Sequence, residues 1–436
     1  MMTRSVSEFS KDLAKAPWLR APDTQKIMQT LGNDAVRVVG GCVRDTLSGL
    51  SALDDGDIDI DMATIHPPED VQDKLSATGF KVIPTGIEHG TVTVVATERN
   101  YEITTLREDI ETDGRHARVR FGSDWQADAA RRDFTINALY ADCDGKIYDP
   151  LEATGTSGLA DLEAGVVRFI GDPDTRIAED YLRVLRFFRF SAQLQPHATD
   201  EKSLAACVRA ANQKDGLAGL SGERLAQELF KLLSHVTAPH ALELMDGAGL
   251  LPFIFPFTPA MDIQSMRLAN LINIQETHFF EADKLLRLAA LCPDSKAVSG
   301  QLSEKLRLSK KHTKRLLAAL DTSCNPVCYM SAREMRRALY ISGREAFIDR
   351  CFLMWAFDEK INNTVQWRAL IAMATSWEKP DFPLTGEMMK TAGVQEGPEM
   401  GRVSQEVERW WIDSDFTEDK LSIIERLKAV VQATIL

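Results

Sequence analysis

Five consecutive residues, Asp57 to Asp61, alternate aspartate with isoleucine. In a β-strand every second side chain lies on the same face, so the carboxylates of Asp57, Asp59 and Asp61 would project together while the two isoleucines enter the core. Neighbouring carboxylates repel one another. A divalent cation removes that repulsion, because Mg²⁺ prefers hard oxygen ligands and completes its shell with substrate phosphates. A solvated edge strand shows the same alternation without a metal, so the pattern alone leaves both interpretations open.

A glycine turn stands shortly before this acidic strand. The run Val38-Val39-Gly40-Gly41 reads as a strand that ends in two glycines and continues into a helix containing Arg44. Glycine lets a backbone approach a phosphate closely, a helix N-terminus presents N–H groups, and an arginine adds a bidentate charge-assisted bond. A purely structural turn can have the same sequence. The position just ahead of the acidic strand is what favours a phosphate site.

These two features and several later motifs resemble one known family. In chain order the motifs are Gly40 to Asp45, Asp59 to Thr64, Tyr101 to Arg107, Asp113 to Ala117, Asp128 to Leu139, Glu179 to Arg186 and, more weakly, Glu223 to Leu229. The chain resembles the class II CCA-adding enzyme (tRNA nucleotidyltransferase) and bacterial poly(A) polymerase family, within the DNA polymerase β superfamily. The resemblance covers Val38 to Leu233, and the C-terminal part adds little to it.

The resemblance implies three catalytic carboxylates, Asp59, Asp61 and Glu102, with Asp59 and Asp61 holding Mg²⁺. The interval between the glycine turn and the acidic strand is longer than usual in the family, which makes the choice of aspartates ambiguous. We choose Asp59 and Asp61 because Ala63-Thr64 follows them as it does in the family, and Asp57 is the alternative. Glu102 lies on a later β-like run, where a surface acid of a strand is the competing interpretation.

The resemblance also assigns the nucleotide-binding residues. They are Gly40, Gly41, Arg44, Arg132, Asp180, Arg183, Arg186 and Arg189. Independently of the family, Asp172-Pro173-Asp174 predicts the start of one long helix that runs to about Leu194. Asp180 and Arg183 would then be neighbours on one face, where an acceptor and a donor fork could meet a base edge. An ordinary ion pair between them is the alternative. Because each residue turns a helix by about 100°, Arg189 would lie on a different face of the predicted helix from Asp180.

The pattern of apolar residues divides the chain into a mixed head and a helical remainder. In the head, helical patterns alternate with short β-like runs at 36–39, 57–61, 91–95 and 101–106. From Gly158 onward, apolar residues recur every three or four positions. We therefore expect an α+β fold, in which a head with a mixed β-sheet and helices precedes an all-helical neck, body and tail. The expected bounds are 1–150 for the catalytic nucleotidyltransferase head, 151–220 for the base-recognising neck, 221–300 for the body and 301–436 for the tRNA-contacting tail.

Acidic residues outnumber basic residues by 64 to 51, and the net charge of −13 argues against a protein that coats nucleic acid nonspecifically. A local basic surface is enough for a nucleic-acid enzyme, because phosphate contacts act within a Debye length of about 8 Å. The segment 305–315 predicts one basic helix, on which Lys310, Lys311 and Lys314 would contact RNA phosphates. A solvated helix face explains these lysines equally well.

Arg115 lies in a predicted loop and could help orient the nucleotide or the RNA end.

Cysteine usage and apolar runs bear on the compartment. Seven cysteines, an odd number without a C-x-x-C pair, indicate neither a disulfide framework nor a zinc knuckle. No run of eighteen apolar residues occurs, and the first residues do not read as a secretion signal. We expect a cytoplasmic protein without a membrane association.

The function that the resemblance implies is template-independent addition of C, C and A to the tRNA 3′ end from CTP and ATP. The expected chemistry is a two-metal transfer that releases pyrophosphate, with no obligate protein partner. A poly(A) polymerase or A-adding enzyme shares the same site, and the lack of a long basic C-terminal extension disfavours it. A noncatalytic tRNA-binding protein on the same fold would be expected to have lost an acid or the glycine turn, and this chain keeps both.

Overall fold

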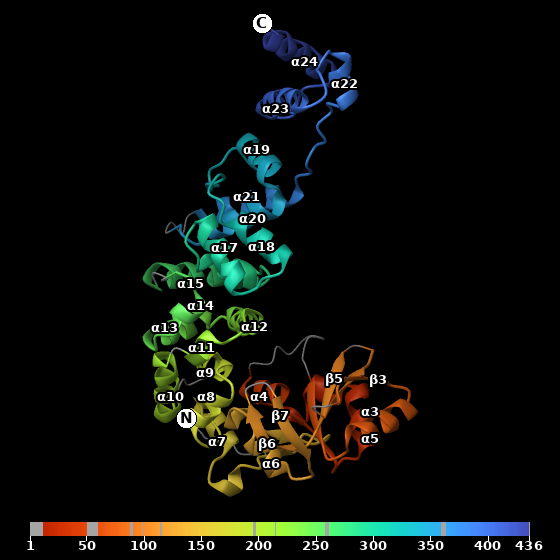
Figure 1. The fold of residues 1–436 in the computed structure, drawn as a ribbon, viewed down its shortest axis with the longest axis vertical. Coiled ribbons are helices and arrows are strands. Elements are labelled where there is room, and N and C mark those ends of the chain that lie inside the picture. Colours follow the sequence, from red (N-terminus) through yellow and green to blue (C-terminus); the bar gives the residue numbers. More distant parts are fainter. Residues whose placement is uncertain are drawn as a thin grey trace. The chain divides into compact units, whose positions relative to one another are not determined.

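The computed structural model of the chain forms two compact units, Met1–Phe255 and Pro256–Leu436 (Figure 1). It describes residues 12–49, 60–87, 90–97, 99–113, 116–194, 198–213, 215–257, 261–358 and 363–435. Among these residues, no helix is both long and apolar enough to span a lipid bilayer.

A seven-stranded mixed sheet organises the first unit, in the order β3-β4-β5-β2-β1-β8-β9. The strands are β1 Val36–Val39, β2 Ile60–Thr64, β3 Lys81–Gly86, β4 Thr91–Val95, β5 Asn100–Thr105, β8 Tyr140–Ala141 and β9 Ile147–Tyr148. β2 and β5 run parallel, and the other neighbouring strands are antiparallel. The expected mixed sheet is confirmed. Of the predicted acidic strand, the part from 57 to 59 lies outside the described residues.

One face of this sheet is apolar and packed. Ile60 and Met62 of β2 and Tyr101 and Ile103 of β5 are each 1% exposed. Two helices pack on the sheet: α3 (Pro22–Leu31) contacts β1, and α5 (Pro68–Ala77) contacts β3 and β4 (Figure 1). The Thr24 hydroxyl of α3 lies 3.0 Å from the Tyr101 hydroxyl of β5. Because side chains alternate along a strand, Asp61 and Glu102 lie on the opposite face.

A separate hairpin follows the sheet strand β5. It consists of β6 (Arg107–Asp113) and β7 (His116–Phe121), with Asp113 opposite His116. The predicted loop around Asp113 to His116 is flanked on both sides by these two strands. Arg115 lies outside the described residues.

Short elements and helices complete the first unit. They are α2 Pro17–Arg20, α4 Gly41–Ser48, α6 Trp125–Ala130, η2 Thr135–Asn137, η3 Glu152–Thr154, α7 Gly158–Ala164, β10 Val166–Val167, α8 Pro173–Glu179, α9 Leu182–Gln193, β11 Ala198–Thr199, α10 Glu201–Asn212, α11 Asp215–Ala218, α12 Gly222–Leu233, α13 Ala238–Gly247 and α14 Leu251–Ile254.

The single long helix predicted from Asp172 to about Leu194 is wrong, because the chain forms α8 and α9 with a break between them. Asp180 at the break has extended backbone (φ −158°, ψ 105°), and its Oδ1 accepts a hydrogen bond from the Leu182 N–H at 3.1 Å. An aspartate side chain competes in this way with helical hydrogen bonding. The Tyr181 ring also lies directly on Gly216, where a Cβ atom would be only 2.0 Å from the ring. The predicted helix start at Asp172 is confirmed.

The described part of the second unit is helical, as expected. Its helices are α15 Met261–Thr277, α16 Lys284–Ala290, α17 Lys296–Lys305, α18 Lys310–Ala319, α19 Ala332–Ser342, α20 Arg344–Trp355, α21 Thr364–Ser376, α22 Gly386–Thr391, α23 Pro398–Asp413 and α24 Lys420–Ile435. The division into head, neck, body and tail with bounds at 150, 220 and 300 stays a prediction.

Candidate active site

Two of the predicted catalytic carboxylates are direct neighbours across parallel strands. Asp61 of β2 is in register with Glu102 of β5, so both side chains stand on the same face of the sheet. Asp61 is half-buried and Glu102 is exposed. The same row continues through Thr93 of β4 on one side and Val39 of β1 on the other. Asp59 and the alternative Asp57 lie outside the described residues.

The glycine turn touches this acidic row. Gly40 follows β1 with φ 79° and ψ −126°, a conformation that side-chain-bearing residues rarely adopt. A Cβ atom at Gly40 would lie 3.9 Å from Asp61 Oδ2 and 3.9 Å from Arg132 Nη1. Helix α4 begins at the next residue, Gly41. The turn therefore brings a helix N-terminus, the Asp61 carboxylate and the Arg132 guanidinium together, and their role in binding metal and phosphate stays a prediction.

Arg132 is held rigidly at this turn by Asp128 and Tyr140. Its Nη2 donates to Asp128 Oδ2 at 3.1 Å, and its Nε donates to the Tyr140 hydroxyl at 3.1 Å. Burial opposes the charge of the guanidinium, but Tyr140 and Asp128 outweigh it and raise the pKa of Arg132 above its ordinary value. Among the described residues Nη1 has no hydrogen-bond partner, and it is the nitrogen that lies beside Gly40. Arg132 is thus a fixed cation with one donor group available at the turn.

Arg44 makes contacts within the protein, and its predicted role in triphosphate binding stays a prediction. Its Nε and Nη2 donate to the Asp45 carboxylate at 2.7 and 2.8 Å, and Nη1 donates to Asn137 Oδ1. The Asn137 amide in turn donates to Asp133 at 2.9 Å, and Asp133 accepts from Arg186 Nε at 2.7 Å. This chain of contacts connects the glycine turn to helix α9.

Arg186 and Arg189 converge on one buried acid. Glu228 of α12 is 6% exposed and accepts from Arg189 Nε at 2.9 Å and from Arg186 Nη1 at 3.5 Å. Both guanidinium groups lie over the Phe190 ring, with centroid distances of 5.4 Å for Arg186 and 4.0 Å for Arg189. The structure therefore places these two predicted nucleotide-binding arginines in a packed ion-pair cluster.

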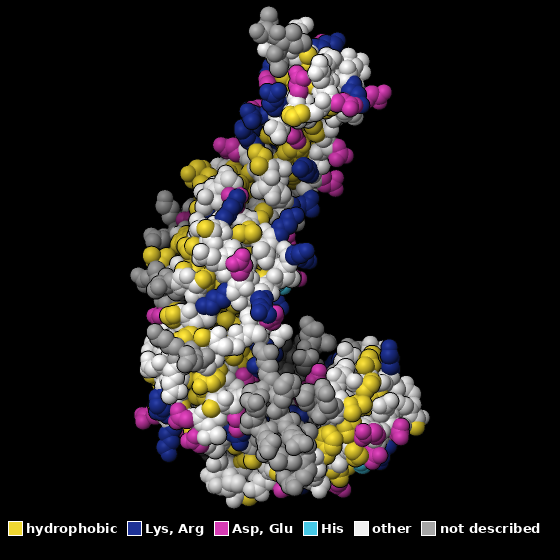
Figure 2. Space-filling view, in the orientation of Figure 1, with side chains coloured by type: hydrophobic (Ala, Val, Ile, Leu, Met, Phe, Trp, Pro, Cys, Tyr) yellow, Lys and Arg dark blue, Asp and Glu magenta, His cyan; other side chains and the backbone are white. Residues whose placement is uncertain are grey.

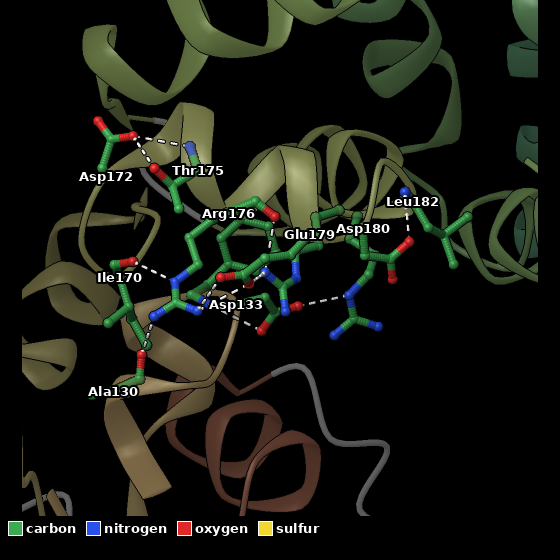
Figure 3. A network of polar contacts seen from close by, with 12 residues as sticks. Ala130, Asp133, Ile170, Asp172, Thr175, Arg176, Glu179, Asp180 and Leu182 are labelled. Atoms are coloured by element: carbon green, nitrogen blue, oxygen red, sulfur yellow. Dashed lines mark hydrogen bonds and ion pairs between the residues drawn. The ribbon is translucent and has the colours of Figure 1, made fainter. Parts of the chain in front are cut away.

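Asp180 lies at the break between α8 and α9, close to Leu182 (Figure 3). Asp180 and Arg183 have different ionic partners. Asp180 Oδ2 accepts from Arg224 Nη2 at 2.7 Å. Arg183 Nη1 donates to Glu179 Oε2 and to the Arg176 carbonyl oxygen. The direct ion pair between Asp180 and Arg183 is therefore not what the structure shows. Both side chains are partly exposed, at 25% and 17%.

A thiol also lies beside the site. Burial, together with the nearby charges of Asp61 and Asp45, raises the pKa of Cys42 to about 12. The thiol therefore stays protonated near neutral pH, which excludes it as a nucleophile.

The three lysines predicted to contact RNA are exposed on α18 of the second unit. The segment 305–315 is not one helix: α17 ends at Lys305, and α18 starts at Lys310 after Arg307 with φ 46°. Arg315 belongs to an internal cluster and donates to Asp349 at 2.8 Å. Figure 2 shows lysine and arginine side chains spread over the drawn face of this unit.

Sequence reasoning missed the residues that support the site. Asn137, Asp133 and Asp128 stood inside a quoted motif without a role, and Glu228 stood in the weakest match. These roles could have been predicted from chemistry: buried arginines require acidic partners, and this motif contains acids and an amide close to arginines in the sequence.

Asp133 gives the first testable prediction. Burial alone would raise the pKa of its carboxyl, but Arg186 and Asn137 lower it below the ordinary 3.8. A depressed pKa adds stability above the unfolded value and loses it as pH falls, because the folded state then resists protonation. We expect the Asp133→Asn variant to be less stable than the parent at pH 7, with the difference shrinking below pH 4. Urea denaturation at several pH values measures this. Asp73→Asn, at an exposed position of α5, is the control variant. A pH-independent difference for Asp133→Asn would contradict the assignment.

Comparison with known proteins places this geometry in a family. Residues 36–168 match the Poly A polymerase head domain, and residues 199–261 match the probable RNA and SrmB-binding site of polymerase A. The Mus musculus protein named CCA tRNA nucleotidyltransferase 1, mitochondrial, is 33% identical over 411 residues, covering 91% of this chain and 87% of the relative. The chain belongs to the CCA tRNA nucleotidyltransferase family.

Bacterial members of the CCA tRNA nucleotidyltransferase family match along most of the chain as well. The CCA-adding enzyme of Streptococcus gordonii is 30% identical, covering 89% of this chain and 92% of the relative. The crystal structure of the Bacillus stearothermophilus CCA-adding enzyme in complex with CTP is 25% identical with a TM-score of 0.71, covering 94% of this chain and 97% of that one. The family resemblance and the α+β fold with a helical remainder are thereby confirmed.

Proposed function

We propose that this chain adds C, C and A to the 3′ end of tRNA, using CTP and ATP and releasing pyrophosphate. The observation that carries the proposal is the row formed by Asp61 and Glu102 beside Gly40, in a chain whose relatives are named for CCA addition. A noncatalytic role is disfavoured because both acids and the glycine turn are present in one place.

The donor set fits a divalent cation, which nucleotidyltransferases of this family use. Asp61 and Glu102 present hard carboxylate oxygens on one face, although the described residues gather no cluster of three or more ligating side chains. We propose Mg²⁺, held by Asp61 together with Asp59. When bound, it would neutralise charge on the phosphates and lower the pKa of the attacking hydroxyl.

The chain's own residues position the triphosphate. Gly40 leaves room for close approach, the first N–H groups of α4 favour an anion, and Arg132 Nη1 supplies a fixed donor beside them. The tRNA 3′-oxygen then forms a bond to the α-phosphorus while the bond to pyrophosphate breaks. Three further arginines are proposed to hold the site in place, because each donates a hydrogen bond to another side chain of the protein: Arg44, Arg186 and Arg189.

Base choice is proposed for Asp180 and Arg183. Both are partly exposed and each has a charged partner, Arg224 and Glu179 respectively, that a base edge could replace. We expect Arg183→Ala to lower kcat/KM for CTP and ATP by about tenfold to a hundredfold and to increase misincorporation, since a lost hydrogen bond to a charged group costs about 1.5–3 kcal/mol. Single-nucleotide incorporation assays measure this. Arg209→Ala, which removes an exposed arginine of α10, serves as the control. Unchanged nucleotide preference in Arg183→Ala would refute the role.

We propose that three exposed lysines contact tRNA phosphates, namely Lys310, Lys311 and Lys314. Arg115, which lies outside the described residues, is proposed to help orient the nucleotide or the RNA end.

A cytoplasmic location is likewise proposed from the sequence. Three vertebrate relatives are named mitochondrial.

The deciding experiment supplies tRNA that lacks its 3′ CCA with Mg²⁺ and labelled CTP or ATP, separately and together. We expect two C residues with CTP alone and a complete CCA end with both nucleotides. Incorporation of A alone onto varied RNAs would replace the proposal with a poly(A) polymerase or A-adding activity.

A further inference from the structure

The face of the sheet beyond Glu102 carries a set of threonine hydroxyls. Thr93 stands next to Glu102 in the acidic row, and Thr91 stands opposite Thr104 one step along the strands. Thr85 on β3 reaches the same face, because its hydroxyl lies 2.7 Å from that of Thr93. The hydroxyls of Thr91 and Thr104 are 3.0 Å apart. These four residues are exposed or half-buried, and we call them the threonine face.

Among the described residues of the acidic row, Glu102 is exposed and Thr93 is half-buried on this side. On the other side of Asp61 the row continues into Val39 and Tyr140, which are 1% and 0% exposed beneath a packed core. The glycine turn and Arg132 also lie on that buried side. The proposed triphosphate site therefore occupies one side of Asp61, and the threonine face occupies the other.

Phosphoryl transfer needs the attacking and leaving oxygens roughly in line on opposite sides of the phosphorus. If pyrophosphate leaves toward Gly40 and Arg132, the attacking oxygen must come from the side of Glu102. We propose that the threonine face binds the ribose-phosphate backbone of the RNA 3′ end and delivers its terminal hydroxyl to Asp61 and Glu102. This inference rests on the proposed function, which it extends with a binding surface and a direction of approach.

The chemistry of the face suits such a ligand. In each threonine pair one hydroxyl donates to the other, so one O–H per pair stays available to a ribose or phosphate oxygen. Hydroxyl groups carry no charge, and they can donate to or accept from any ribose or phosphate oxygen. That neutrality matters because the terminal nucleotide changes at every step of CCA addition, so the surface that holds it must tolerate each end. Backbone contacts position a nucleic acid without specifying its sequence.

The test is Thr93→Val, which keeps the shape of the side chain and removes its hydroxyl. We expect the KM for tRNA lacking CCA to rise about threefold to tenfold, the range for one lost hydrogen bond, with the KM for CTP unchanged. Thr93→Ser restores a hydroxyl and should restore the KM for tRNA. Thr97→Val, at an exposed position just after β4, is the matched control. Thr85→Val removes the partner hydroxyl from an exposed position and should act in the same direction, which keeps the test valid if Thr93→Val folds poorly.

The outcomes separate the two proposals. A parent enzyme that adds no nucleotide to the tRNA overturns the proposed function itself. An active parent whose Thr93→Val and Thr85→Val variants keep the same KM for tRNA overturns the threonine face as the RNA surface. A rise in the KM for CTP with the KM for tRNA unchanged overturns the direction of approach, because it would place the nucleotide on this side.

Discussion

Replacing Asp61 with asparagine is expected to lower kcat for CTP and ATP addition on the order of 10³-fold, the scale of losing a group that stabilises the transition state electrostatically. Asparagine keeps the size of the side chain but removes the charge that a metal needs. Asp61 is half-buried at the edge of the core, and its strand is held by Ile60 and Met62, so the fold should persist. Initial-rate measurements with saturating tRNA, together with circular dichroism, check both parts.

Asp73→Asn is the matched control, because Asp73 is an exposed aspartate of α5 in the same unit. It should leave kcat unchanged. Activity of Asp61→Asn within tenfold of the parent would remove Asp61 from the catalytic group. Asp59→Asn, made in parallel, tests the second metal ligand that the sequence predicts.

Replacing Glu228 with alanine is expected to destabilise the first unit by about 3–5 kcal/mol, because breaking a buried ion pair leaves uncompensated charge in the interior. Two arginines, Arg186 and Arg189, depend on this carboxylate and lie over the Phe190 ring. Urea denaturation of the full chain, with the two units' transitions compared, measures the loss. Nucleotide addition should fall as well, since the contact chain to Asn137 and Arg44 starts at Arg186.

The control for Glu228 is Asp174→Ala. Asp174 pairs with Arg209, and the two side chains are 53% and 52% exposed, so solvent screening limits the pair to less than about 1 kcal/mol. Similar losses for the two variants would show that burial of the Glu228 cluster adds no stability. Glu228→Gln should give an intermediate loss, because an amide still accepts one hydrogen bond.

The sequence predicted a mixed sheet and the alternation of buried and outward side chains along β2 and β5, because both depend on local patterning. Ile60, Met62 and Ile103 are buried while Asp61 and Glu102 stand on the other face, as period-two patterning requires. The direct pairing of Asp61 with Glu102 could not be predicted from alternation, since it depends on which strands become neighbours. The family resemblance named both residues as catalytic but did not say that their strands are neighbours.

The prediction of one helix from 172 to 194 failed because a side chain took a hydrogen bond that the helical backbone would otherwise make. Nothing in the periodicity between 172 and 194 marks a break, yet the Asp180 carboxylate bonds the Leu182 N–H and Tyr181 packs on Gly216. Asn137, one partner of Arg44, could not be predicted either, because it lies 93 residues away in the sequence and only folding brings it near. The run of basic residues at 305–315 predicted a single basic surface helix. Arg315 instead donates to the Asp349 carboxylate inside the second unit, and the sequence does not show this partner.

The register between β2 and β5 couples the placement of Glu102 to the packing of the core. A slip of one residue would turn Glu102 inward and expose Tyr101 and Ile103, which are now 1% exposed. Such a slipped chain would lose its core along with its metal ligand. Molecules that are soluble and well folded yet catalytically misassembled at this sheet should therefore be rare, and the active fraction of a preparation should track its folded fraction.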